Sequence, residues 1–110
     1  MIRIAICDNE KDTRVYLSEL VRKHPVECEI TEYGSSKEYL SGHGEFDLLF
    51  LEVRLEIPGD GMELAMKIRG GEWKKQPLLI FVTSYEKYVY DAFDVGAFQY
   101  LLKPINERKF

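Results

Sequence analysis

The sequence has few cysteines, no long apolar run and no excess of basic residues. Its two cysteines, Cys7 and Cys28, lack the spacing of a metal-binding pair, and Cys7 lies in an apolar run typical of a reduced core residue. No apolar stretch approaches the roughly 20 residues of a transmembrane helix. A net charge of −4 argues against direct nucleic-acid binding, which needs a concentrated basic patch. These absences exclude a disulfide scaffold and a membrane span, and they favour a cytoplasmic protein.

The 110 residues instead show short apolar runs that alternate with amphipathic segments, without repeats or linkers. The runs predict strands at 2–7, 27–33, 46–52, 77–83 and 97–102. Helical spacing predicts helices at about 10–23, 61–69 and 84–95, with a short one from Ser35 or Ser36 to about Gly42. Asn9 is a candidate cap for the first helix. Alternation of this kind predicts one α/β domain with a doubly wound parallel sheet.

The stretch FDLLFLEVRLEIPGDG, residues 46–61, shows a buried strand that ends on an acid, Glu52. Other predicted strands are also followed by polar residues: Asp8-Asn9-Glu10 after the first, Thr83 at the end of the fourth and Lys103 after the fifth. Because the carboxyl ends of parallel strands share one edge of the sheet, we expect these side chains to meet there.

Acids, a hydroxyl and an ammonium around one space suit phosphoryl chemistry. Carboxylates bind a hard cation such as Mg²⁺, and the hydroxyl and lysine suit phosphoryl oxygens. A central carboxylate can itself accept the phosphoryl group as an acyl phosphate. The alternative is that Asp8 and Asn9 only cap a helix and Glu52 is a solvated loop acid; the complementary set at all these strand ends makes that alternative weaker.

The motif FVTSYEKYVYDAFDVGAFQYLLKPI, with the acid that follows the first strand, resembles the receiver domain of bacterial two-component response regulators, most closely the LytTR type. The resemblance covers nearly the whole chain. It implies a flavodoxin-like fold with strand order 2-1-3-4-5, here with the fifth helix truncated or missing. It also implies that residues 1–110 form a receiver domain and that a DNA-binding effector domain lies outside this chain.

The resemblance assigns metal and acceptor roles residue by residue. Asp8 and Asn9 match the acidic pair that binds Mg²⁺. Glu52 matches the phosphate-accepting Asp, which also contacts the metal, and Arg54 matches the position whose backbone carbonyl does so.

The switch residues lie in the second half of the chain. Thr83 matches the hydroxyl that turns toward a bound phosphoryl group, and Lys103 matches the lysine that pairs with phosphate and acceptor. Pro104 matches a proline preceded by a cis peptide bond, and Tyr100 matches an aromatic switch with two rotamers.

The sequence departs from the family pattern at three places around this centre. Glu52 is one methylene longer than Asp, so we expect impaired phosphorylation, or a permanent charge that mimics it. Asn9 removes one negative charge, so we expect weaker Mg²⁺ affinity. The loop after Glu52 is one residue longer than usual, which together with Asn9 favours a natural variant over a deliberate Asp-to-Glu substitution.

The resemblance also predicts partners. We expect a sensor histidine kinase upstream, an effector domain in cis, and a possible homodimer through the fourth helix and fifth strand, where Tyr88 and Tyr90 are candidate contact residues. No nucleic acid, membrane or enzymatic activity beyond self-phosphorylation is expected of this domain.

Two other classes compete with this interpretation. A small Mg²⁺-dependent phosphohydrolase of the haloacid-dehalogenase type would use the acids of DNEKDT, but its second acid is Glu10 in place of Asp. A flavodoxin-like FMN binder needs a glycine- and hydroxyl-rich phosphate loop, and the acids of residues 8–12 would repel phosphate.

Overall fold

The computed structural model describes residues 1–42, 44–71 and 76–110. The strands are β1 (Ile2–Cys7), β2 (Cys28–Tyr33), β3 (Leu48–Leu51), β4 (Leu78–Thr83) and β5 (Gln99–Leu102). The α-helices are α1 (Lys11–Arg22), α2 (Ser36–Gly42), α3 (Asp60–Gly70) and α4 (Val89–Asp94), with 3-10 turns η1 (Glu86–Tyr88) and η2 (Glu107–Lys109). Every predicted strand and helix is present, although several are shorter than predicted.

All strand pairs are parallel, and the sheet order is β2-β1-β3-β4-β5, as the resemblance implied. In the central pair, Cys7 of β1 lies beside Leu51 of β3. The residues that directly follow them, Asp8 and Glu52, therefore leave the sheet side by side. The register of the central strands is thus what brings the two acids together.

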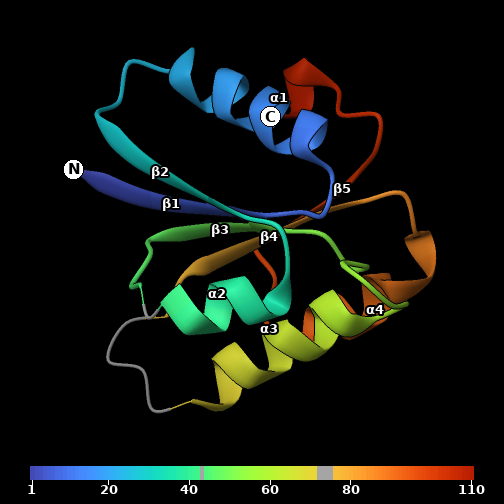
Figure 1. The fold of residues 1–110 in the computed structure, drawn as a ribbon. Helices are drawn as coiled ribbons and strands as arrows, with labels where there is room; N and C mark the ends of the chain where they lie inside the picture. Colours follow the sequence, from blue (N-terminus) through green and yellow to red (C-terminus); the bar gives the residue numbers. More distant parts are fainter. Residues whose placement is uncertain (43, 72–75) are drawn as a thin grey trace.

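Helices cover both faces of the sheet (Figure 1). On one face, α1 packs through Leu17 and Val21 against alternate residues of the central strands, such as Ile6 and Phe50. On the other face, α2, α3 and α4 bury the intervening residues in a second cluster that includes Leu49 and Phe81. Burial on both faces explains why β3 is apolar throughout and β4 is apolar up to Thr83.

Two helix starts differ from the sequence-based expectation. The prediction that Asn9 caps the first helix is wrong, because α1 begins after Glu10, which has no side-chain capping bond. The segment predicted as one helix over 84–95 is divided into η1 and the short α4. The backbone N–H of Tyr85 donates to Thr83 Oγ1, which continues the strand-end turn and delays the helix.

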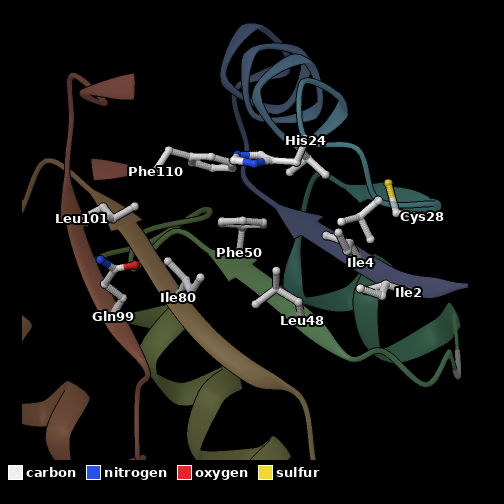
Figure 2. A pocket seen from close by; sticks show the side chains of 12 residues that line it. Ile2, Ile4, His24, Cys28, Leu48, Phe50, Ile80, Gln99, Leu101 and Phe110 are labelled. Atoms are coloured by element: carbon white, nitrogen blue, oxygen red, sulfur yellow. The ribbon is translucent and has the colours of Figure 1, made fainter. Parts of the chain in front are cut away.

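After β5 the chain forms only η2 and then reaches a groove of about 230 Å³ between α1 and the sheet (Figure 2). The Phe110 ring stacks on Phe50, with centroids 5.5 Å apart, and on His24 at 6.0 Å. The groove is lined mainly by apolar side chains of α1 and the strands.

Among the described residues, no helix is both long and apolar enough to cross a bilayer.

Candidate functional site

Two carboxylates are buried at the carboxyl ends of the central strands. Asp8 follows β1 and is 1% exposed, and Glu52 follows β3 and is 5% exposed. Burial of a charged carboxylate is costly unless it is paired and hydrogen-bonded. Glu52 is therefore not a solvated loop acid, and the residue at the cap position of α1 is Glu10 and not Asp8 or Asn9.

Lys103 joins the two acids. Its Nζ donates to Asp8 Oδ2 at 3.0 Å and to Glu52 Oε1 at 2.9 Å, and its side chain is 15% exposed. The Glu10 carboxylate lies 3.5 Å from the same nitrogen at the solvent edge of the site. The peptide bond that follows, to Pro104, is cis. The ammonium of Lys103 thus lies within ion-pair distance of three carboxylates. The sequence analysis did not assign Glu10 a contact with this lysine.

Backbone amides hold the remaining carboxylate oxygens. Asp8 Oδ1 accepts from the N–H of Glu10 at 2.9 Å. Glu52 Oε2 accepts from the N–H of Val53 at 2.6 Å and, at 3.5 Å, from that of Arg54. The longer side chain of Glu52 therefore folds back on its own loop, and both of its oxygens have a partner.

Burial and pairing act on the same groups in opposite directions. Burial raises the pKa of Asp8 above its ordinary value, although the Glu10 N–H and Lys103 lower it. Burial lowers the pKa of Lys103, but the hydrogen bonds to Glu52 and Asp8 outweigh this and leave that pKa raised. Lys103 is therefore a cation at neutral pH, as a partner of phosphate must be.

Thr83 and Tyr100 lie next to this centre and bind the loop after β4. Thr83 is fully buried, and its carbonyl accepts from the N–H of Lys103 at 2.9 Å. The Tyr100 hydroxyl donates to the carbonyl of Tyr85 in the loop after β4. Burial raises the pKa of Tyr100 to about 12, and the charge of Glu52 adds to the effect. Asp8, Glu52, Thr83 and Tyr100 are thus linked through Lys103 and the loop after β4.

The two remaining metal candidates lie at the edge of the site. The side chains of Asn9 and Arg54 are both exposed. Within the described residues, no three acids, histidines or cysteines are arranged to share a metal ion. The two buried carboxylates still fit Mg²⁺, which binds one or two protein carboxylates and keeps several waters.

Three exposed aromatic residues lie on α4 and directly before β5. Tyr90 is 79% exposed, Phe93 74% and Phe98 66%. Tyr88 is half-buried and packs against the core, so it contributes less to this surface than Tyr90 does. The sequence analysis did not identify Phe93 as a surface residue, because apolar residues at helical spacing are usually buried.

A comparison with protein families decides the identity of this arrangement. Residues 4–110 match the model of the response regulator receiver domain. The chain belongs to that family. It is a receiver domain of the LytT/LytR kind of two-component response regulator.

Curated relatives carry names of that kind. The chain is 37% identical to the sensory transduction protein LytT of Enterococcus faecalis, with 98% of this chain and 44% of the relative aligned. It is 32% identical to LytT of Bacillus subtilis, over 99% of this chain and 45% of the relative. The chain spans less than half the length of these relatives.

Solved structures show the same fold. The response regulatory domain of the protein mrkE from Klebsiella pneumoniae aligns with a TM-score of 0.85 at 28% identity, over 98% of this chain and 88% of that one. The response regulator TrrA from Thermotoga maritima, in complex with Mg²⁺–BeF, aligns with a TM-score of 0.80 at 29% identity, over 99% and 92%. The comparisons give no support to the phosphohydrolase alternative.

Proposed function

We propose that this receiver domain signals with a permanent carboxylate at its acceptor position and is impaired as a phosphoryl acceptor. One observation carries the proposal: both oxygens of Glu52 are engaged, one by Lys103 Nζ and the other by the N–H of Val53. An acceptor must present a free oxygen in line with the phosphorus atom. These contacts compete with attack on phosphorus, because they hold both carboxylate oxygens in their present orientation.

The same contacts support a fixed signalling bias. Glu52 holds Lys103 by charge, and the backbone N–H of Lys103 bonds Thr83 at the start of the loop that Tyr100 binds. A charge at the acceptor position therefore acts on the switch residues through direct contacts. The size of the bias equals the difference in interaction free energy between the two states of the switch.

We propose Mg²⁺ as the cation of this centre, held by Asp8, by Glu52 and by the backbone carbonyl of Arg54, with Asn9 as a neutral neighbour. The complex of TrrA with Mg²⁺–BeF supports this choice. When bound, the cation supplies positive charge to phosphoryl oxygens. Because Asn9 lacks the negative charge of an acid, we expect this site to bind Mg²⁺ more weakly than receivers with two acids at these positions do.

Upstream and downstream partners follow from the family. We propose a sensor histidine kinase as the input, a cytoplasmic location, and a transcriptional effector domain in the same protein as the output. The greater length of the curated relatives supports the last point, as does the description of the relative from Staphylococcus aureus as a transcriptional regulatory protein. The exposed side chains of Tyr90, Phe93 and Phe98 are the proposed contact residues, either with that domain or in a homodimer.

Intact mass spectrometry after incubation with acetyl phosphate and Mg²⁺ tests the acceptor. We expect no phosphoryl gain for the unchanged chain and one phosphoryl gain for Glu52→Asp, which shortens the carboxylate so that it no longer reaches its own loop amide. Glu52→Gln is the negative control. A phosphoryl group on Glu52 itself in the unchanged chain would overturn the proposal.

Hydrogen exchange tests the permanent charge. Glu52→Gln keeps the shape of the side chain but loses the charge that holds Lys103, so we expect faster amide exchange in residues 84–95. Equal exchange in this segment in both proteins would show that the charge does not bias the switch.

A further inference from the structure

The side chain of Asp60, the first residue of α3, organises the loop after β3. Its Oδ1 accepts from the N–H of Leu55 at 2.7 Å. Its Oδ2 accepts from the N–H of Glu56 at 2.9 Å and from that of Ile57 at 3.3 Å. A carboxylate that accepts several backbone N–H groups fixes the path of the chain that wraps around it.

The loop is also held at its start. The N–H of Gly61 donates to the carbonyl of Val53 at 2.7 Å, directly beside Asp60. The backbone N–H groups of Val53 and Arg54 face Glu52 Oε2. The segment from Glu52 to Ile57 is thus clamped between the acid centre and the first turn of α3.

These contacts determine the orientation of the peptide unit between Arg54 and Leu55. A trans peptide is planar, with its N–H and C=O on opposite sides, and the cis bond among the described residues is the one before Pro104. Because the N–H of Leu55 points to Asp60, the carbonyl of Arg54 points to the other side of the chain.

We propose that Asp60 is a positioning residue that directs the Arg54 carbonyl into the acid centre as its backbone metal ligand. The inference rests on the metal centre proposed above. The loop is one residue longer than the common form of the family, so it has more freedom to lose on ordering. The three amide contacts of Asp60 supply that order.

The expected consequence is a change in metal affinity. Mg²⁺ requires near-octahedral geometry, so a rotated carbonyl is lost as a ligand. Removing an outer partner that orients a ligand typically weakens metal binding about 10- to 100-fold. Asp60→Asn keeps the size of the side chain but leaves one oxygen to accept from the loop, and we expect roughly tenfold weaker binding.

The test is a titration of the 110-residue chain with Mn²⁺ as the probe, with free Mn²⁺ measured by electron paramagnetic resonance. The matched control is Glu56→Gln, which removes one charge from the exposed side of the same loop and keeps the amide contacts, so we expect affinity within about twofold of the unchanged chain. Asp8→Asn removes a proposed ligand and shows how much Mn²⁺ binds when the centre is impaired. Asp60→Ser, which keeps a single acceptor, is the second variant if Asp60→Asn does not fold.

The outcomes separate the inference from the metal centre itself. Weaker Mn²⁺ binding by Asp60→Asn, together with a smaller rise of its thermal midpoint on adding Mn²⁺, supports the inference. A lower midpoint without metal but unchanged Mn²⁺ affinity would assign Asp60 a purely structural role and overturn it. If the unchanged chain binds Mn²⁺ no better than Asp8→Asn does, the metal centre and the inference both fail.

Discussion

The two loops that deliver acids to the centre are built differently. The loop after β1 is short: Asp8 follows directly from a buried strand, and one backbone N–H, that of Glu10, holds its second oxygen. The loop after β3 is longer, contains Gly59 at φ 81°, and depends on Asp60 and on close contact with α3. The register of the central strands places both acids, but the path of the loop behind Glu52 also depends on tertiary contacts with Asp60 and α3.

Lys103 is the feature that both loops share, so its removal should have the largest effect. Lys103→Met leaves two buried carboxylates without their cation, and we expect a loss of about 3–5 kcal/mol in the free energy of unfolding. Urea denaturation followed by circular dichroism measures the loss.

Lys23→Met is the matched control for this change. Lys23 also contacts a carboxylate, that of Glu107, at 2.8 Å, but both side chains are more than half exposed. We expect little change, because exposed ion pairs contribute little to stability. Similar losses for the two variants would mean that burial of the pair is not what makes Lys103 important.

Gly61 distinguishes the two loops, because only the loop after β3 requires a residue without a side chain. A Cβ at Gly61 would lie 1.8 Å from the carbonyl oxygen of Glu52. Gly61→Ala should therefore displace the acceptor loop and reduce the free energy of unfolding by about 2–3 kcal/mol.

Gly70→Ala in the last turn of the same helix is the control. No atom of the described residues lies within 4 Å of a Cβ there, and alanine should stabilise the helix by about 0.5 kcal/mol. Thermal unfolding midpoints of the two variants, compared with that of the unchanged chain, measure both effects. An unchanged midpoint for Gly61→Ala would show that the loop adapts easily and that its geometry is not restrained by α3.

The same contrast explains what could be predicted from the sequence. Strand periodicity and the α/β alternation predicted the sheet and the polar residues at its edge, because these follow from local pattern and topology. The contact of Glu52 Oε2 with Val53 was not predicted, since it depends on how a longer side chain folds within one particular loop.

Residues whose roles depend on packing partners were also missed. In the sequence, Asp60 looks like an ordinary acid in the first turn of a helix. Its contacts with three loop amides are known only from the structure. Phe93 falls at helical spacing but is exposed, because α4 is short and turns only one side to the core. A spacing rule does not show how a six-residue helix is rotated.

Cys7, the last residue of β1, allows a test of how stability depends on pH. Burial raises the pKa of its thiol from 9.0 to about 12. Above pH 9 the unfolded chain releases this proton while the folded chain keeps it, so stability should fall with rising pH, by up to about 1.4 kcal/mol per pH unit.

Urea midpoints at pH 8, 9 and 10 measure this slope. Cys7→Ala should be less stable at pH 8 but should lose less stability between pH 9 and 10. Parallel curves for the two proteins would show that groups other than Cys7 cause the alkaline loss, for example Tyr39, whose pKa burial also raises to about 12.

The smallest expected effect is on metal binding, and it tests whether the loop after β1 or the loop after β3 limits phosphorylation. Asn9→Asp adds a carboxylate beside Asp8 in the loop after β1, where the family pattern has a second acid. We expect about fivefold tighter Mn²⁺ binding, roughly 1 kcal/mol, and still no phosphoryl gain from acetyl phosphate, because the contacts of Glu52 are unchanged. Gln99→Glu, at the opposite end of β5, adds the same charge away from the centre and should leave affinity within about twofold. If Asn9→Asp alone allowed phosphorylation, the missing acid in the first loop, and not the folded-back carboxylate in the second, would be what limits this receiver.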